Sequence, residues 1–261
     1  MRRSWLLPLI VAFLLPAVLA LARRPHAEPG LTSLQAIASD AAAAQAVALE
    51  SSLGRAVAGN LAAEPPTVLT PDPERDRSDW PVIVAFGDSL TAGLGVEPDR
   101  NYPSQLQALL DQAGYRYRVV NAGISGELTA GGLLRVETVL EHQPEIVILE
   151  LGANDGMQAV PVAEVRANLA GIIEHVQAAG AQAVLAGMMA PPNYGEEYQQ
   201  AFAQIYPDLA AAYDLPLIPF FLEGVAGSPY LNQRDGIHPT PEGYAIVVRN
   251  VLATLEPLLQ P

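Results

Sequence analysis

The sequence predicts an α/β domain built on a parallel β-sheet, and two observations carry this prediction. From Val82 onward, short apolar runs alternate with longer segments whose apolar residues recur at helical spacing. Such alternation is typical of a parallel sheet covered by helices on both faces. Half of the 261 residues are hydrophobic, so the chain can supply a sizeable core. We therefore expect one α/β domain preceded by an additional segment.

The strands and helices of this domain can be placed in order along the chain. The clearest strand signal is the sequence EIVILEL, and several amphipathic segments stop at a glycine, such as Gly114 and Gly180. The expected strands are Val82–Phe86, Arg118–Asn121, Glu145–Leu151, Ala183–Met189 and Leu215–Pro219. The expected helices are Tyr102–Ala113, Leu128–His142, Val162–Ala179, Glu196–Tyr213 and Pro241–Leu259.

Residues 1–24 have the features of a targeting segment. Two arginines near the N-terminus precede an apolar run from Leu6 to Ala22, and Ala20-Leu21-Ala22 forms a small-residue cleavage signal. This pattern predicts a cleaved signal peptide and an exported protein, periplasmic or secreted. The alternative is an anchor over residues 5–22 that holds the protein at the inner membrane, because about 17–25 apolar residues can span a bilayer.

Residues 25–80 differ from the chain that follows them. The part from Leu31 to Ala63 is rich in alanine with apolar residues at helical spacing, and the part after it is rich in proline and charge. These features indicate a helical segment followed by a linker, with no active-site chemistry of its own. The remainder, 81–261, is expected to form the α/β domain.

The composition excludes several classes of chemistry. The formal net charge is −14, so the surface repels phosphate backbones and we expect no nucleic-acid partner. The chain has no Cys, which excludes a thiol nucleophile, a disulfide framework and thiolate metal sites. It also has no Lys, which excludes Schiff-base chemistry and a GxxxxGK phosphate loop. Ser, His, Asp and Glu remain for catalysis.

Polar, glycine-containing motifs follow three of the expected strands. The carboxyl ends of parallel strands meet at one edge of a sheet, where ligands bind. A fourth motif lies just before the last expected helix, so we expect all four to contribute to one site. The motifs are FGDSL at 86–90, NAGISG at 121–126, LGAND at 151–155 and DGIHP at 235–239.

These motifs contain the groups that ester cleavage needs, namely a nucleophile, a base, a residue that orients the base and donors for the oxyanion. The hydroxyl of Ser89 is inert until an imidazole takes its proton, and His238 can be that base. Asp235, three residues earlier, can bind the other ring nitrogen and fix its tautomer. Candidate oxyanion donors are the N–H of Ser89, the N–H of Gly126 and the side-chain amide of Asn154.

Each of these residues also has a purely structural interpretation. Ser89 could cap a helix, since Asp and Ser after a strand commonly start helices. Asp88 is expected to be a hydrogen-bond acceptor that stabilises its loop, and Asp155 is expected to be structural. Asp235 and His238 could together bind a metal, as His with carboxylate does. The other histidines, His26, His142 and His175, are expected away from this edge of the sheet, which counts against a metal site. Glu127 is expected on a solvated face.

Seven motifs taken together resemble the GDSL/SGNH hydrolases, and within them the bacterial group of thioesterase I, lysophospholipase L1 and arylesterases. The resemblance implies a flavodoxin-like, three-layer α/β/α fold with a mostly parallel five-stranded sheet and no metal or cofactor. It also implies Ser89 as nucleophile with Asp235 and His238, and Gly126 and Asn154 as oxyanion donors beside the Ser89 amide. The motifs are FGDSLTAGLG (86–95), NAGISGELTAGGL (121–133), VILELGAND (147–155), PNYG (192–195), FAQIYPDLA (202–210), PLIPFFLE (216–223) and DGIHPTPEG (235–243).

The sequence departs from this family pattern at two places, with GAND where GGND is common and Glu127 where Asp is common. The resemblance also implies substrate-lining regions at 156–161 and 188–192. Both are largely apolar and contain no Arg, which fits an acyl chain. The lining residues expected from them are Gly156, Met157, Met189, Ala190 and Pro191.

The sequence therefore predicts a serine hydrolase that cleaves esters or thioesters of acyl groups through an acyl-enzyme on Ser89. Its partner is expected to be a small-molecule acyl ester or thioester, and the N-terminal segment offers a possible membrane association. One alternative is a carbohydrate O-deacetylase, which the same superfamily includes. A second alternative is a non-catalytic binding module of the cell envelope.

Overall fold

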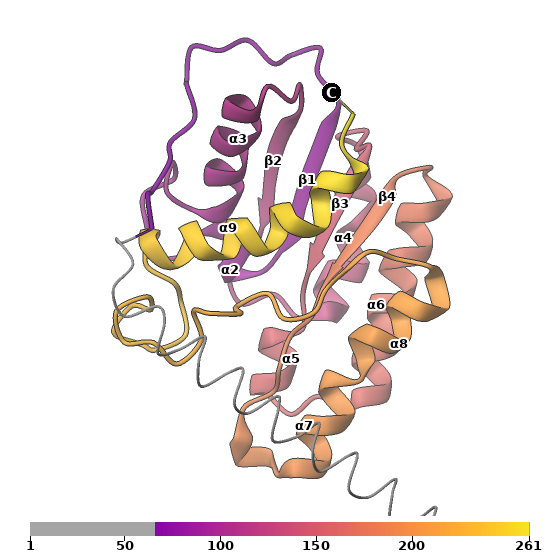
Figure 1. Cartoon of the computed structure of the whole chain (residues 1–261). Coiled ribbons are helices and arrows are strands. Elements are labelled where there is room, and N and C mark those ends of the chain that lie inside the picture. Colours follow the sequence, from indigo (N-terminus) through magenta and orange to yellow (C-terminus); the bar gives the residue numbers. More distant parts are fainter. Residues whose placement is uncertain (1–65, 261) are drawn as a thin grey trace, which may run out of the picture. The chain divides into compact units, whose positions relative to one another are not determined.

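The computed structural model describes residues 66–260, which form three layers with a β-sheet in the middle (Figure 1). The signal peptide or anchor and the helical segment expected between residues 1 and 65 lie outside the described residues. Within 66–260, every helix is too short or too polar to cross a lipid bilayer.

The sheet has five strands, all parallel, in the order β2-β1-β3-β4-β5. This is the strand order of flavodoxin-like folds, so the predicted fold class is confirmed. Such an order reverses direction between β1 and β3, and the crevice outside the carboxyl ends of these strands is where such folds bind ligands. The strands are β1 Val82–Gly87, β2 Arg118–Gly123, β3 Ile146–Glu150, β4 Gln182–Ala186 and β5 Leu217–Ile218.

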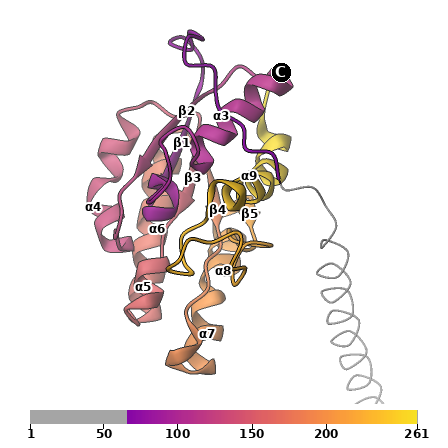
Figure 2. The same cartoon turned by 90° about the vertical axis from the view of Figure 1, so that its left-hand side faces the viewer.

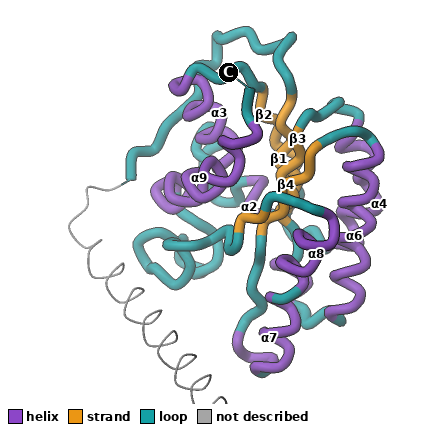
Figure 3. The backbone as a smooth tube through the Cα atoms, turned by 45° about the vertical axis from the view of Figure 1, so that its right-hand side comes forward, coloured by secondary structure: helices purple, strands orange, loops and turns teal. Residues whose placement is uncertain are grey.

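The long helices cover both faces of the sheet (Figure 3). On one face lie α3 (Tyr102–Ala113) and α9 (Pro241–Leu255), which pack on each other. On the other face lie α4 (Thr129–Leu140), α6 (Val162–Ala178) and α8 (Ile205–Tyr213). The shorter elements are α2 Ser89–Ala92, α5 Ala153–Met157, α7 Glu196–Ala203 and the 3₁₀ turns η1 Pro192–Tyr194 and η2 Glu256–Leu258.

The central strands β1 and β3 are buried along their whole length. This explains their continuous apolar sequences, because a parallel strand covered on both faces cannot alternate between a polar and an apolar side. The edge strand β2 is only partly buried. The short helices α5 and α7, which follow β3 and β4, lie at the same end of the sheet, near the carboxyl ends of the strands (Figure 2).

Several predicted elements are interrupted or shorter in the structure, among them the strand expected at 183–189, which ends at Ala186. The single helix expected at 196–213 is two helices that meet at Gln204. Pro207 explains this break, because a proline has no N–H for the helical ladder and is tolerated only in a first turn, here that of α8. The last helix ends at Leu255 and continues as a 3₁₀ turn that contains Pro257. The strand expected at 215–219 retains only Leu217 and Ile218.

The described part of the proline-rich stretch, 66–80, contacts the α/β domain. Arg77 forms an ion pair with Asp111 of α3, and Arg75 lies 3.7 Å from the same carboxylate. The Trp80 ring has three guanidinium groups within 4.9 to 5.9 Å, those of Arg75, Arg77 and Arg116. Such cation–π contacts and the ion pair attach this stretch to the amino end of the sheet.

Candidate active site

Ser89 lies where β1 ends and the short helix α2 begins. Asp88 caps this helix, because its Oδ1 accepts a hydrogen bond from the Leu90 N–H at 2.9 Å. The residue before it must be glycine, since a Cβ at Gly87 would lie 2.2 Å from Thr91 Oγ1 and 2.4 Å from Glu150 Oε2. The FGDS sequence therefore makes a tight turn that leaves the Ser89 side chain at the carboxyl end of the sheet, with the residue 7% exposed.

The motif that precedes α9 places two further polar side chains beside Ser89. His238 Nε2 lies 2.8 Å from Ser89 Oγ, and His238 Nδ1 lies 2.7 Å from Asp235 Oδ2. Asp235 Oδ1 also accepts hydrogen bonds from the N–H groups of Ile237 and His238, which fixes the carboxylate. The structure thus brings these three predicted residues into one hydrogen-bonded chain. Within the described part of the chain, no three His, Asp or Glu side chains gather as metal ligands would.

The carboxylate of Asp235 is held in its ionised form. The hydrogen bond from His238, followed by those from the two backbone N–H groups, lowers its pKa from 3.8 to about 2. An ionised Asp235 accepts the Nδ1–H of His238, and this tautomer leaves Nε2 without a proton. Nε2 can then accept the hydroxyl proton of Ser89.

Two of the three predicted oxyanion donors are backbone N–H groups that have no hydrogen-bond partner among the described residues. The N–H groups of Ser89 and Gly126 donate to no other atom within residues 66–260. Gly126 has a φ of +82°, a conformation that side-chain-bearing residues rarely adopt. A Cβ placed on Gly126 would meet no atom of residues 66–260 within 4 Å, so the glycine is favoured by its backbone conformation and not by a close contact.

Asn154 is the third predicted donor, and its amide is already hydrogen-bonded. Its Nδ2 donates to Asp88 Oδ2 at 2.9 Å and to the Glu127 carbonyl oxygen at 3.0 Å. Asp88 is fully buried, and burial raises its pKa to about 6 although the Leu90 N–H bond opposes this shift. Asp155, next in sequence, accepts from the N–H and hydroxyl of Thr129 at 2.9 and 2.6 Å and so joins α5 to the start of α4.

The two regions expected to line the substrate lie against each other. An added Cβ on Gly156 would be 3.2 Å from the Cα of Ala190, so the glycine permits a close approach of α5 to the segment after β4. The Tyr194 hydroxyl donates to the Met157 carbonyl oxygen at 2.6 Å and ties the same two regions together. Met189 is exposed, as a substrate-lining side chain can be, and Ala190 is buried. Pro191 is half-buried.

Sequence reasoning missed two acidic residues near the site. Glu150 is the last residue of β3 and is fully buried; its Oε2 accepts from the Thr91 hydroxyl at 2.7 Å and, more weakly, from the Asp88 N–H at 3.4 Å. Burial raises its pKa well above the usual range. The sequence does carry a signal for it, because a Glu inside a buried apolar strand is rare. Glu127 was expected on a solvated face, but its carboxylate is buried and pairs with Arg135.

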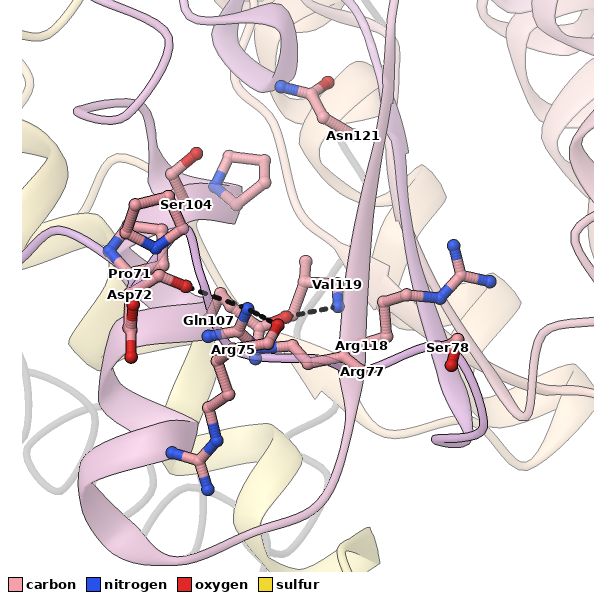
Figure 4. A pocket seen from close by; sticks show the side chains of 12 residues that line it. Pro71, Asp72, Arg75, Arg77, Ser78, Ser104, Gln107, Arg118, Val119 and Asn121 are labelled. Carbon is pink, nitrogen blue, oxygen red and sulfur yellow. Dashed lines mark hydrogen bonds between the residues drawn. The ribbon is translucent and has the colours of Figure 1, made fainter.

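A cavity of about 350 Å³ opens elsewhere, beside the free edge of β2 (Figure 4). Its lining includes Arg75, Arg77 and Arg118 but none of the candidate site residues. The Arg75 and Arg118 guanidinium groups point in different directions, and Arg77 is bound to Asp111 (Figure 4). These side chains do not converge on a common point, so the cavity does not compete with Ser89 as the reactive centre.

Comparisons with known proteins show the family of the chain. Residues 85–246 match the model of the GDSL-like lipase/acylhydrolase family. The chain is 43% identical over 178 residues to esterase TesA of Pseudomonas aeruginosa, an alignment that covers 68% of this chain and 89% of that protein. It is 38% identical over 178 residues to thioesterase 1/protease 1/lysophospholipase L1 of Escherichia coli K12, covering 68% and 84% of the two chains.

A solved structure shares the fold as well as the sequence. The chain matches the crystal structure of AlinE4, an SGNH-hydrolase family esterase, with 44% identity and a TM-score of 0.59, covering 69% of this chain and 95% of that one. The family match spans more than half of the chain and both curated relatives are covered over more than two thirds of their length. The chain therefore belongs to the GDSL-like lipase/acylhydrolase family and is an esterase that hydrolyses esters or thioesters.

Proposed function

We propose that the enzyme works through an acyl-enzyme on Ser89, with His238 as general base and acid and Asp235 as the residue that orients His238. The observation that carries this proposal is the continuous chain from Ser89 Oγ to His238 Nε2 at 2.8 Å and from His238 Nδ1 to Asp235 Oδ2 at 2.7 Å. These distances lie within the reach that proton transfer between a nucleophile and its base requires.

The reaction proceeds in two halves. Ser89 Oγ attacks the carbonyl carbon of the substrate while His238 Nε2 takes the hydroxyl proton. The tetrahedral intermediate collapses, the bond to the leaving oxygen or sulfur breaks, and His238 returns the proton to that atom. A water molecule then attacks the acyl-enzyme with His238 as base, and the acid is released with Ser89 regenerated.

The oxyanion of each tetrahedral intermediate binds the N–H groups of Ser89 and Gly126. Both N–H groups have no partner within residues 66–260, so they meet the oxyanion without giving up another hydrogen bond. Asn154 Nδ2 is the third donor. One of its two hydrogens, which it now donates to Asp88 or to the Glu127 carbonyl oxygen, also interacts with the oxyanion. Donors fixed in place before the reaction stabilise the charge that develops in the transition state.

Exposed apolar side chains on the segments that follow β2, β3 and β4 favour an apolar acyl group over a sugar ester. Met157 and Met189 are 36% and 58% exposed, and Ile124 in the Gly126 loop is 49% exposed. Exposed apolar side chains beside a reactive group are typical of a surface that binds apolar ligand. We propose Gly156, Met157, Met189, Ala190 and Pro191 as the residues that line the acyl group.

A substitution of the nucleophile tests this function. Ser89→Ala should abolish hydrolysis of p-nitrophenyl butyrate and of the matching thioester, while circular dichroism and the melting temperature remain those of the wild type. The neighbouring Ser125→Ala is the matched control, since Ser125 takes no part in the hydrogen-bonded chain. Turnover retained by a folded Ser89→Ala protein would reject the acyl-enzyme.

We further infer that the protein is exported. The support comes from the sequence, in which a basic start, an apolar run over 6–22 and the Ala20-Leu21-Ala22 signal are combined. N-terminal sequencing of protein recovered from the periplasm or medium should begin near residue 23. A protein that retains Met1 and sediments with the inner membrane would instead support the anchor over residues 5–22.

A further inference from the structure

Arg135 of α4 is hydrogen-bonded to three different segments beneath the candidate oxyanion donors. Its Nε donates to Glu127 Oε1 at 2.7 Å, and its Nη2 donates to the Ala122 carbonyl oxygen at 2.8 Å. Nη2 also lies 3.4 Å from the Gly87 carbonyl oxygen, and the guanidinium carbon lies 4.5 Å from the centre of the Phe86 ring. One side chain therefore contacts the carboxyl ends of β1 and β2 and the loop that follows β2.

Glu127 connects this side chain to the donors themselves. Its carboxylate binds Arg135, while its backbone carbonyl accepts from Asn154 Nδ2 at 3.0 Å. Gly126, whose N–H is a candidate donor, is the residue directly before it. The segment that Arg135 contacts in β1 ends two residues before Ser89. The Arg135–Glu127 pair is thus connected to all three candidate donors. Two of them are linked through Glu127, and Ser89 is linked through the end of β1.

The pair is sheltered from water and has a defined geometry. The Arg135 side chain is 19% exposed and the Glu127 side chain 8% exposed. Arg135 binds both carboxylate oxygens, an arrangement that the planar guanidinium group fits and an ammonium group does not. Gly131, one turn before Arg135, leaves room for Glu127, because a Cβ there would lie 3.2 Å from Glu127 Cγ.

We propose that Arg135, acting through Glu127, is a positioning residue that keeps the three oxyanion donors at fixed positions relative to one another. This inference rests on the function proposed above. Arg135 does not touch the substrate; it sets where the Gly126 N–H and the Asn154 amide lie relative to Ser89. Because these donors act on the transition state, a loss of position lowers kcat more than it weakens substrate binding.

The first test replaces Arg135 by Met and by Lys. Arg135→Met should lower kcat for p-nitrophenyl butyrate on the order of 10²-fold, as small displacements of catalytic groups do. Arg135→Lys should lose about tenfold, because it keeps the charge without the bidentate geometry. The matched control is Arg166→Met, which removes an Arg–Asp208 ion pair between α6 and α8 that is exposed on both sides. The control should keep its kcat.

A double variant separates positioning from stability. Arg135→Met leaves the Glu127 carboxylate buried without its partner, which destabilises the fold. Adding Glu127→Gln removes that charge and should restore much of the melting temperature. Positioning predicts that kcat stays low in the double variant, since the contacts to β1, β2 and the Gly126 loop are still missing. Recovery of kcat together with the melting temperature would overturn the proposal and leave Arg135 a structural residue.

The third readout is inhibitor affinity. A boronic acid that forms a tetrahedral adduct on Ser89 should bind Arg135→Met more weakly by about the same factor as kcat/KM falls. KM for the ester should change by less than about threefold. Equal weakening of KM and of boronate affinity would contradict the proposal. An inactive wild type, or a folded and active Ser89→Ala protein, would instead reject the function on which the proposal rests.

Discussion

The side-chain amide of Gln233 donates a hydrogen bond to the Leu94 carbonyl oxygen at 2.7 Å and so joins the loop of His238 to the segment after Ser89. The same Nε2 donates to the Pro239 carbonyl oxygen at 3.0 Å, and the Gln233 N–H donates to the His238 carbonyl oxygen at 2.7 Å. Leu94 in turn donates its N–H to the Ser89 carbonyl oxygen. Gln233 therefore helps to set the distance between the base and the nucleophile.

Replacing Gln233 by Met should separate the two loops without removing volume. We expect kcat for a p-nitrophenyl ester to fall about tenfold while KM changes by less than about twofold, because the nucleophile and base lose their alignment. Steady-state kinetics on purified protein measure both constants. Gln177→Met is the control, since Gln177 Nε2 also binds a carbonyl oxygen, that of Tyr213, but on the surface. A Gln233→Met protein with the wild-type kcat would show that this contact does not align the pair.

The buried carboxyl of Asp88 gives a pH dependence of stability with a definite sign. Its pKa is raised from 3.8 to about 6 by burial, so the folded state binds its proton more tightly than the unfolded chain. This contribution is fully present below 3.8 and is lost as the pH rises to about 6. The wild type should therefore lose on the order of 3 kcal/mol relative to Asp88→Asn across that range.

Denaturant unfolding of both proteins at a series of pH values measures this difference. The control is the pair of wild type and Asp76→Asn, because Asp76 is exposed and its hydrogen bonds with Ser78 lower its pKa, so any pH dependence of this pair has the opposite sign. A difference between wild type and Asp88→Asn that stays constant from pH 4 to pH 7 would contradict a raised pKa at Asp88. If the wild type instead became more stable relative to Asp88→Asn as the pH rises, the pKa of Asp88 would be lowered and not raised by folding.

Glu150 is expected to be protonated and to stabilise the turn that carries Ser89. Burial raises its pKa well above the usual range, and its Oε2 accepts from Thr91 and Asp88, the residues on either side of Ser89 and Leu90. Glu150→Gln keeps an acceptor of the same shape and should retain activity within about twofold. Glu150→Leu leaves the Thr91 hydroxyl without its partner and should lower stability by about 1–3 kcal/mol.

Melting temperatures and ester turnover of the two Glu150 variants check this prediction. Thr91→Val should resemble Glu150→Leu in stability, since it removes the other half of the same hydrogen bond. A large loss of activity in Glu150→Gln would indicate that the charged form of Glu150 is required. Equal stability of Glu150→Leu and Glu150→Gln would show that the hydrogen bond to Thr91 contributes nothing.

The strands and most helices could be predicted from sequence because each is encoded locally. The apolar runs of β1 and β3 reflect burial on both faces, and the glycine after Ala113 ends α3 in a left-handed conformation. The break at Gln204 could have been predicted from Pro207, whose missing N–H interrupts a continuous helix. The length of β5 could not, because it depends on how far β4 remains available as a partner.

The candidate site likewise contains residues that could be predicted from the sequence and residues that could not. Ser89, His238, Asp235, Gly126 and Asn154 stand in short motifs whose residue types reveal their chemistry. Arg135 and Gln233 carry no such mark, because what distinguishes them is a partner far away in the chain. Arg135 approaches Gly87, and Gln233 approaches Leu94, only because the tertiary fold brings distant segments together. Sequence order alone cannot show which carbonyl oxygen a surface-type side chain will reach.

The proposed mechanism makes Ser89 Oγ the atom that becomes acylated. The most direct measurement is covalent labelling of the wild type with a fluorophosphonate, followed by peptide mass spectrometry. We expect one adduct per chain, on the peptide that contains Ser89, with complete loss of ester hydrolysis and no adduct on Ser89→Ala. An adduct on another residue that abolishes activity, or full activity with Ser89 labelled, would contradict it.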